Sequence, residues 1–231
     1  MDEAFTYNAF LSGGPPEIQA TNPYNVNLNS LLMGVSVRAF PLSELTVRLP
    51  AVLGGLIYFS ALFLLCRRLF GESMWLMLAV SLSSLNPFLL DYLSAARGYG
   101  LAMAFLTLGI YLALRCLDAE PESAWKYFVP AGVAFGLAAG SHVTAIFAVV
   151  ALEGTLIVMR ICQRRGSTRL VAAQPGLLLG TTVIVSLAIL WEPMRNARHQ
   201  YVDGVLPVLR DGIRTLTDAS LLYRPTAFTS H

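Results

Sequence analysis

Two adjacent carboxylates, Asp2 and Glu3, near the start of the 231-residue chain are the first residues whose chemistry suggests catalysis. Partial desolvation raises the pKa of a carboxyl group, so that it can take a proton from an acceptor hydroxyl near neutral pH. An acidic pair also favours the first turn of a helix, where negative charge is stabilising. The pair taken alone leaves both interpretations open.

A second set of candidate residues surrounds Arg97, in the stretch Leu93-Ser-Ala-Ala-Arg-Gly-Tyr-Gly100. The planar guanidinium offers paired donors to phosphate oxygens, and Gly98 and Gly100 let a ligand approach the backbone closely. Asp91 precedes Arg97 and could orient it. The alternative is an arginine that only extends its charge to the membrane interface.

Two further ionisable residues, His142 and Glu153, lie in largely apolar sequence. Ionisable groups at membrane depth are usually functional or paired. His142 interrupts the apolar region at Gly140-Ser-His-Val-Thr144, and a neutral imidazole bound to backbone carbonyls is an equal alternative there. Glu153 needs a partner or a proton, and the sequence does not identify which.

A fourth group, Arg195, Arg198 and His199, follows the last apolar stretch. Spacings of three and four residues place these side chains on one helical face, which suits an anionic lipid headgroup. A solvated face next to the membrane is the more common meaning of such a cluster.

The composition shows which elements must hold these residues. Hydrophobic residues make up 55% of the chain and charged residues 13%, whereas a soluble domain has about 25% charged residues. A soluble globular enzyme is therefore excluded. The net charge of +2 gives no reason to expect a nucleic acid partner. Cys66, Cys116 and Cys162 lack metal-ligand spacing, so no metal site is predicted.

We predict an all-α, polytopic integral membrane protein with about six transmembrane helices. The predicted spans are the apolar stretches 45–66, 75–90, 98–115, 125–139, 142–160 and 173–191. Apolar residues at helical spacing in 28–39 and 206–216 predict amphipathic helices in the membrane interface, or alternatively helices that pack on the spans.

Basic residues fall in alternate short loops, which predicts that those loops are cytoplasmic. Three regions result: an outward loop at 1–44, a transmembrane helical domain at 45–191 and an outward juxtamembrane segment at 192–231. We expect a multi-pass protein of the cell (cytoplasmic) membrane, with its candidate site facing outward, to the periplasm. Because no apolar segment precedes the first loop, the sequence is interpreted as part of a larger multi-span protein.

Taken together, these segments resemble the dolichyl-phosphate-mannose protein mannosyltransferase superfamily, which includes the bacterial aminoarabinose transferases. The resemblance extends in order over most of residues 1–191. The matching segments are Asp2-Glu3, Asn27-Leu-Asn-Ser-Leu-Leu32, Val47-Arg-Leu-Pro-Ala-Val-Leu-Gly-Gly55, Ala96-Arg-Gly-Tyr-Gly100 and Ser141-His-Val-Thr-Ala145.

The resemblance implies a membrane-embedded glycosyltransferase of the C-type fold. Such an enzyme moves a hexosyl or pentosyl unit from a polyprenyl-phosphate donor to the hydroxyl of a glycan, lipid or protein acceptor, with inversion. Membrane lipids are its other expected partners, and no cofactor is assigned, although a divalent metal ion is left open. The implied roles are those of a base for Asp2 with Glu3 beside it, donor-phosphate binding for Arg97, Tyr99, Arg195 and Arg198, and support for Asp91 and His142.

The second hypothesis is a transporter or flippase subunit for a lipid-linked substrate. Broken helices and a buried Glu153 would suit it, because transporter sites gather near the membrane midplane. The candidate groups here gather instead on the predicted outward face. A membrane scaffold without chemistry is a third interpretation, under which the outward acids are dispensable.

Overall fold

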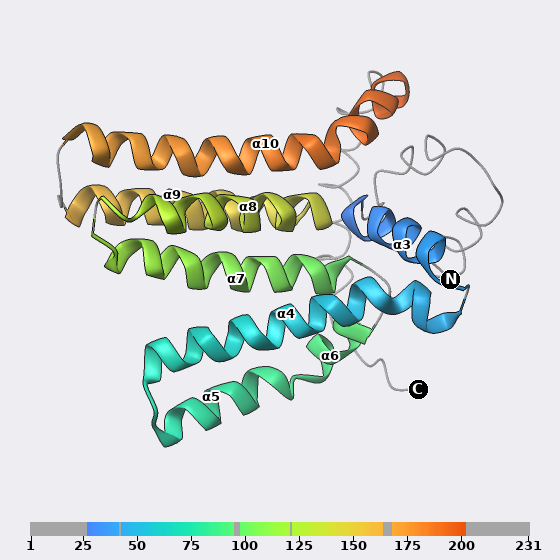
Figure 1. Ribbon diagram of the computed structural model, residues 1–231, viewed down its shortest axis with the longest axis horizontal. Helices are drawn as coiled ribbons and strands as arrows, with labels where there is room; N and C mark the ends of the chain where they lie inside the picture. Colours follow the sequence, from blue (N-terminus) through green and yellow to red (C-terminus); the bar gives the residue numbers. More distant parts are fainter. Residues whose placement is uncertain (1–26, 42, 95–97, 121, 164–167, 202–231) are drawn as a thin grey trace, which may run out of the picture.

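The computed structural model describes residues 27–41, 43–94, 98–120, 122–163 and 168–201. Regular structure in these residues is entirely helical, as predicted, and the long helices run side by side in one bundle (Figure 1). The helices are α3 (Asn27–Ala39), α4 (Glu44–Phe70), α5 (Met74–Ser84), α6 (Pro87–Ser94), α7 (Tyr99–Asp118), α8 (Trp125–Ser141), α9 (Ala145–Gln163) and α10 (Thr168–Tyr201).

Four segments of these helices are long and apolar enough to cross a membrane: Leu45–Phe70, Tyr99–Asp118, Ala145–Gln163 and Ala173–Trp191. The polytopic membrane fold is thereby confirmed. The predicted fourth span is the 17-residue α8. The predicted second span, 75–90, is divided between α5 and α6, because the residue before a proline disfavours helical geometry and Asn86 precedes Pro87.

The ends of α4 are set by local chemistry. The hydroxyl of Ser43 accepts a hydrogen bond from the amide of Thr46 at 3.2 Å, which caps the first turn of the helix. Gly71 ends α4 with a φ of +63°, a region that favours glycine, and its amide donates to the carbonyl of Arg67. The chain can therefore turn sharply into α5.

A row of glycines on α8 faces α10. Gly132, Gly136 and Gly140 follow at intervals of four residues and share one side of the helix. A β-carbon added at Gly136 would lie 2.6 Å from Cβ of Val185, and one at Gly140 would lie 2.6 Å from Cδ1 of Ile189. Both distances are shorter than real contacts, so the two helices approach this closely only because the side chains are absent.

A neighbouring side of α8 packs on α7. Phe128 and Phe135 are fully buried there, and a β-carbon at Gly109 of α7 would lie 2.5 Å from the ring of Phe135. Together with Val149 of α9 and Leu178 of α10, these residues form the main apolar core. Helix α8 is therefore the central helix of the described bundle.

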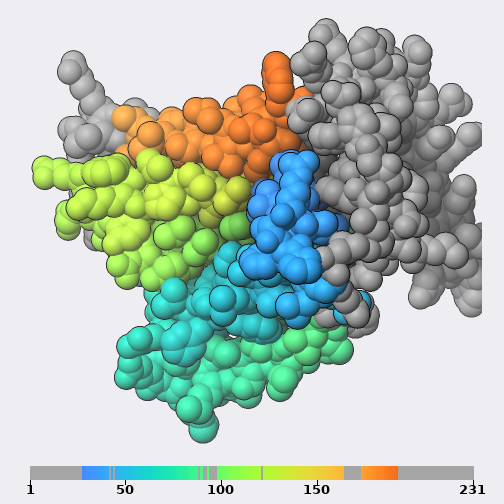
Figure 2. Space-filling view, turned by 45° about the vertical axis from the view of Figure 1, so that its right-hand side comes forward, coloured from blue at the N-terminus to red at the C-terminus, as the bar shows by residue number. Residues whose placement is uncertain are grey.

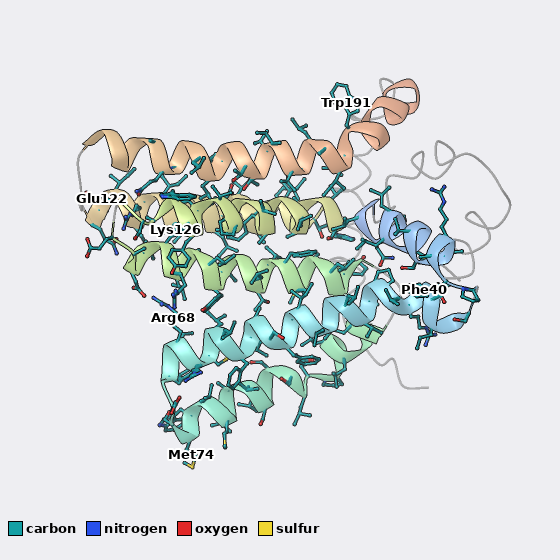
Figure 3. The ribbon with its side chains drawn as sticks, viewed as in Figure 1. Phe40, Arg68, Met74, Glu122, Lys126 and Trp191 are labelled. Atoms are coloured by element: carbon teal, nitrogen blue, oxygen red, sulfur yellow. The ribbon has the colours of Figure 1, made fainter. Side chains whose placement is uncertain are left out.

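Basic side chains gather at one end of the bundle, which we call the Arg115 end. Arg68 forms an ion pair with Asp118, and Arg115 donates to the hydroxyl of Tyr127 at 2.9 Å. Figure 3 shows Arg68 and Lys126 at this end, far from Phe40 and Trp191. Alternating helices bring these residues to one end, as the predicted topology requires.

Arg160, at the same end, is completely buried. Its guanidinium donates to the side-chain oxygen of Gln174 at 3.1 Å, to that of Gln163 at 3.3 Å and to the carbonyl of Ala119 at 3.4 Å. These bonds join α9 to α10 and to the segment after α7. Arg160 therefore holds three parts of the fold together.

The opposite end, which we call the Tyr99 end, contains the start of α7 and the end of α8, with α3 beside them (Figure 1). Figure 2 shows α3 against the bundle, next to α4 and α10. Its buried side chains are Asn29, Met33 and Ser36, whereas Leu31 and Val35 are 53% and 63% exposed. The predicted helix therefore packs on the bundle and leaves an apolar face uncovered, and the one predicted at 206–216 lies outside the described residues.

We expect Gly136→Ala to loosen the contact between α8 and α10, because the added methyl group overlaps Val185 and the carbonyl of Thr182. Overpacking of this kind costs about 1–3 kcal/mol. Thermal unfolding in detergent should show a lower midpoint. Gly180→Ala on α10 is the matched control, since a β-carbon there meets nothing within 4 Å. Equal midpoints for the two variants would contradict the close contact.

We predict that the Arg115 end is cytoplasmic. In a background without Cys66, Cys116 and Cys162, single cysteines at Arg67 and Lys126 should react with an impermeant thiol reagent only in inverted vesicles. A cysteine at Val143, which is 47% exposed at the Tyr99 end, should react in intact cells. Labelling in the reverse pattern would overturn the orientation.

Candidate functional site

The predicted site residues fall into two groups according to what the structure describes. Asp2, Glu3 and Arg97 lie outside the described residues. Three others lie on described helices: Asp91 on α6, and Arg195 and Arg198 on the last turns of α10. The end of α10, like α6, lies at the Tyr99 end (Figure 1).

Tyr99 and His142, from two different sequence motifs, are described in full. Tyr99 opens α7, and His142 follows α8 in an extended conformation that ends the helix. Their rings lie against each other, with centroids 4.2 Å apart and planes inclined by 31°. Residues that the sequence singled out separately therefore meet at one point.

In the turn between α8 and α9, hydrogen bonds fix both the amide and the carbonyl of His142. Its amide donates to the carbonyl of Ala138 at 3.2 Å, and its carbonyl accepts from the amide of Ala145 at 2.9 Å. Nδ1 of the imidazole lies 2.6 Å from Oγ1 of Thr144 and accepts from the amide of Thr144 at 3.3 Å. The helix break predicted from Gly140-Ser-His is thus a short, hydrogen-bonded turn.

Burial lowers the pKa of His142 below its ordinary value. The charged imidazolium is disfavoured because it loses hydration, so burial favours the neutral ring. A neutral imidazole offers one hydrogen-bond donor and one acceptor. His142 is therefore equipped to orient a ligand rather than to attract it by charge.

A close contact between α4 and α7 fixes the Tyr99 side of the site. A β-carbon added at Gly54 would lie 3.3 Å from the amide nitrogen of Leu101 and 3.4 Å from the carbonyl carbon of Gly100. Gly54 belongs to the segment Val47–Gly55, so this segment supports the start of α7. Sequence reasoning quoted that segment for its resemblance but did not assign Gly54 this role, which depends on contact across the bundle.

Glu153 lies within the helices, on α9, and is only 4% exposed. The hydroxyl of Thr182 on α10 lies 2.5 Å from Oε1 of Glu153 and 3.1 Å from the carbonyl oxygen of Gly132 on α8. The partner that the sequence could not name is therefore Thr182. The three residues form a polar link between three helices.

Potential metal ligands do not cluster in the part of the chain that the structure describes. No group of three or more His, Cys, Asp or Glu side chains there is arranged to hold a metal ion. Cys66 and Cys116 are buried thiols, and Cys162 is exposed. The candidate site, in its described part, is therefore argued from the Tyr99 and His142 pair and its turn, not from a metal centre.

We expect Thr182→Val to destabilise the fold by about 1–3 kcal/mol, because Glu153 would stay buried without its hydrogen-bond partner. The measurement is thermal unfolding in detergent. Thr155→Val is the matched control, since Thr155 is exposed and its hydroxyl donates to the carbonyl of Ala151 in its own helix. The double variant with Glu153→Leu and Thr182→Val should recover part of the lost stability, because no carboxyl group stays buried without a partner. A double variant less stable than Thr182→Val would refute the link between Glu153 and Thr182.

Comparison with known proteins identifies a family over most of the chain. The family profile described as dolichyl-phosphate-mannose-protein mannosyltransferase matches residues 28–191, from α3 into α10. Neither a curated protein sequence nor a solved structure matches the chain. The match includes the segments that meet around Tyr99 and His142, and it agrees with the multi-pass helical fold. The chain therefore belongs to the dolichyl-phosphate-mannose-protein mannosyltransferase family.

Proposed function

We propose that this glycosyltransferase moves a hexosyl or pentosyl unit from polyprenyl phosphate to an acceptor hydroxyl at the outer face of the cell membrane. Family membership supports a polyprenyl-phosphate-linked sugar as the donor. The acceptor hydroxyl belongs to a glycan, a lipid or a protein. The reaction inverts the anomeric carbon.

In the proposed reaction the carboxylate of Asp2 takes the proton of the acceptor hydroxyl, with Glu3 beside it. The acceptor oxygen then forms a bond to the anomeric carbon. On the opposite side, the bond from that carbon to the phosphate oxygen breaks, and polyprenyl phosphate leaves with the electron pair. Attack opposite the leaving group accounts for inversion.

Arg97, Arg195 and Arg198 are proposed to stabilise the phosphate as negative charge develops on it. Guanidinium groups suit this task because their donors pair with two phosphate oxygens at once. Tyr99 is proposed to bind the same phosphate, with Asp91 and His142 in support. The placement of α6 and of the last turns of α10 at the Tyr99 end is consistent with these roles.

The observation that carries the proposal is the ring contact between Tyr99 and His142. It joins the Ala96–Gly100 and Ser141–Ala145 segments, both within the range that the family profile matches. A site assembled at a helix end also suits a reaction between a lipid-linked donor and an acceptor outside the bilayer. The lipid tail can stay in the membrane while its phosphate reaches the surface.

A transporter remains the competing hypothesis, and Glu153 is the residue that would support it. That carboxyl group is 4% exposed and bonded to Thr182. The bond between them is a structural link between helices. The described candidate residues of the matched segments, Tyr99 and His142, lie instead at the Tyr99 end. The arrangement therefore favours a surface reaction over a midplane binding site.

Asp2→Asn should lower sugar transfer by roughly 10²–10⁴-fold, the usual contribution of a general base, while donor binding persists. The assay is transfer of labelled sugar from polyprenyl phosphate in liposomes that contain the full-length protein. Glu122→Gln, which removes an exposed carboxylate at the Arg115 end, is the control and should transfer normally. Transfer by Asp2→Asn at the unmodified rate would exclude Asp2 as the base.

Arg97→Lys should mainly weaken interaction with the donor phosphate, because lysine keeps the charge but loses the planar fork. Donor binding and transfer are measured side by side, with Arg67→Lys at the Arg115 end as the control. A scaffold would tolerate the change, and a transporter would move the lipid-linked sugar without forming a glycosidic bond. If no polyprenyl-linked donor yields product, the proposed function is wrong.

A further inference from the structure

The hydrogen bonds at Nδ1 of His142 determine where the imidazole carries its proton. The amide of Thr144 donates to Nδ1 at 3.3 Å, and a backbone amide can only donate. Nδ1 must therefore present its lone pair. The hydroxyl of Thr144, 2.6 Å from the same nitrogen, can rotate to donate as well. In a neutral ring with an unprotonated Nδ1, the hydrogen is on Nε2.

Two other contacts fix the place of the ring. The ring of Tyr99 covers one face of the imidazole at a centroid distance of 4.2 Å. The backbone of His142 is bonded to Ala138 on one side and Ala145 on the other. Ring orientation and tautomer are thus both specified by neighbours that the fold positions.

We infer that Thr144 and Tyr99 are positioning residues that hold His142 as the Nε2–H tautomer, so that His142 acts in the site as a hydrogen-bond donor and not as a base. The lowered pKa of His142 is consistent with the neutral ring that this role needs. Among the described residues, no hydrogen bond from Nε2 to another protein group is present.

The donor role rests on the proposed function and makes it more specific. An N–H at the Tyr99 end suits an anionic oxygen, and the oxygens of the donor phosphate are the anionic groups in the proposed reaction. A neutral donor orients this phosphate, while the arginines supply the charge. Proton removal from the acceptor is left to the carboxylates, since a protonated Nε2 cannot accept a proton.

The tautomer is tested without any activity measurement. The chain has three histidines, and ¹⁵N-histidine NMR of the full-length protein in detergent distinguishes protonated from unprotonated ring nitrogens. The signal of His142 is the one lost in His142→Gln. We expect a protonated Nε2 and an unprotonated Nδ1 at neutral pH. A proton on Nδ1 would overturn the inference.

Two substitutions at position 144 distinguish the effect of the Thr144 hydroxyl on the His142 ring from the effect of the Thr144 amide. Thr144→Ser keeps the hydroxyl and should keep the tautomer. Thr144→Val keeps the shape and the amide but loses the hydroxyl, so Nε2 should stay protonated while the Nδ1 signal of His142 shifts toward that of a nitrogen with a weaker hydrogen bond. An unchanged Nδ1 signal for Thr144→Val would show that the hydroxyl does not bond to the ring, and a proton on Nδ1 in this variant would show that the amide does not fix the tautomer.

Two substitutions at position 142 test the donor role. The amide nitrogen of glutamine reaches the place of Nε2, whereas that of asparagine reaches only the place of Nδ1. His142→Gln should therefore keep most of the transfer, and His142→Asn should lose roughly 10²–10³-fold, as when a donor to a developing anion is removed. Equal activities, or a more active asparagine variant, would indicate a helix-capping role only. If unmodified protein transfers no sugar, the proposed function fails while the NMR result still decides the tautomer.

Discussion

The contact between the glycine face of α8 and α10 is the constraint on which the other contacts depend. Helices inside a bilayer gain little by hiding apolar side chains, so their association relies on close packing and on buried polar bonds. Gly132, Gly136 and Gly140 allow that packing. The same approach brings Thr182 within reach of both the carbonyl of Gly132 and the carboxyl of Glu153. The contact between α8 and α10 thereby fixes α8, α9 and α10 relative to one another, and with them the place where α8 ends.

The two ends of the bundle use this rigidity differently. At the Arg115 end, Arg68 donates to the carbonyl of Leu114 and pairs with Asp118, and Arg160 donates to the carbonyl of Ala119. These charged side chains therefore hold the fold together. At the Tyr99 end, α8 stops in a turn that displays the neutral ring of His142 against Tyr99. Structural charges and candidate ligand-binding groups are therefore separated along the bundle.

Features that depend on local sequence were predictable, and features that depend on contacts across the bundle were not. Apolar stretches identified the helices, and Gly140-Ser-His identified the break after α8. The division near Asn86-Pro87 was missed because hydropathy continues through it. The partner of Glu153 lies on another helix, and the role of the α8 glycines appears only where Val185 and Ile189 meet them. Asp2, Glu3 and Arg97 stay predictions, because they lie outside the described residues.

The central claim is that the polyprenyl-linked donor binds where α7 begins and α8 ends. Photo-crosslinking tests it most directly, with a polyprenyl phosphate sugar that carries a diazirine in the isoprene unit next to the phosphate. Mass spectrometry should find the label on peptides from the starts of α7 and α9, near Tyr99 and Ala145, and excess unlabelled donor should suppress it. Label concentrated near Arg115 and Lys126, or near Glu153, would contradict the account.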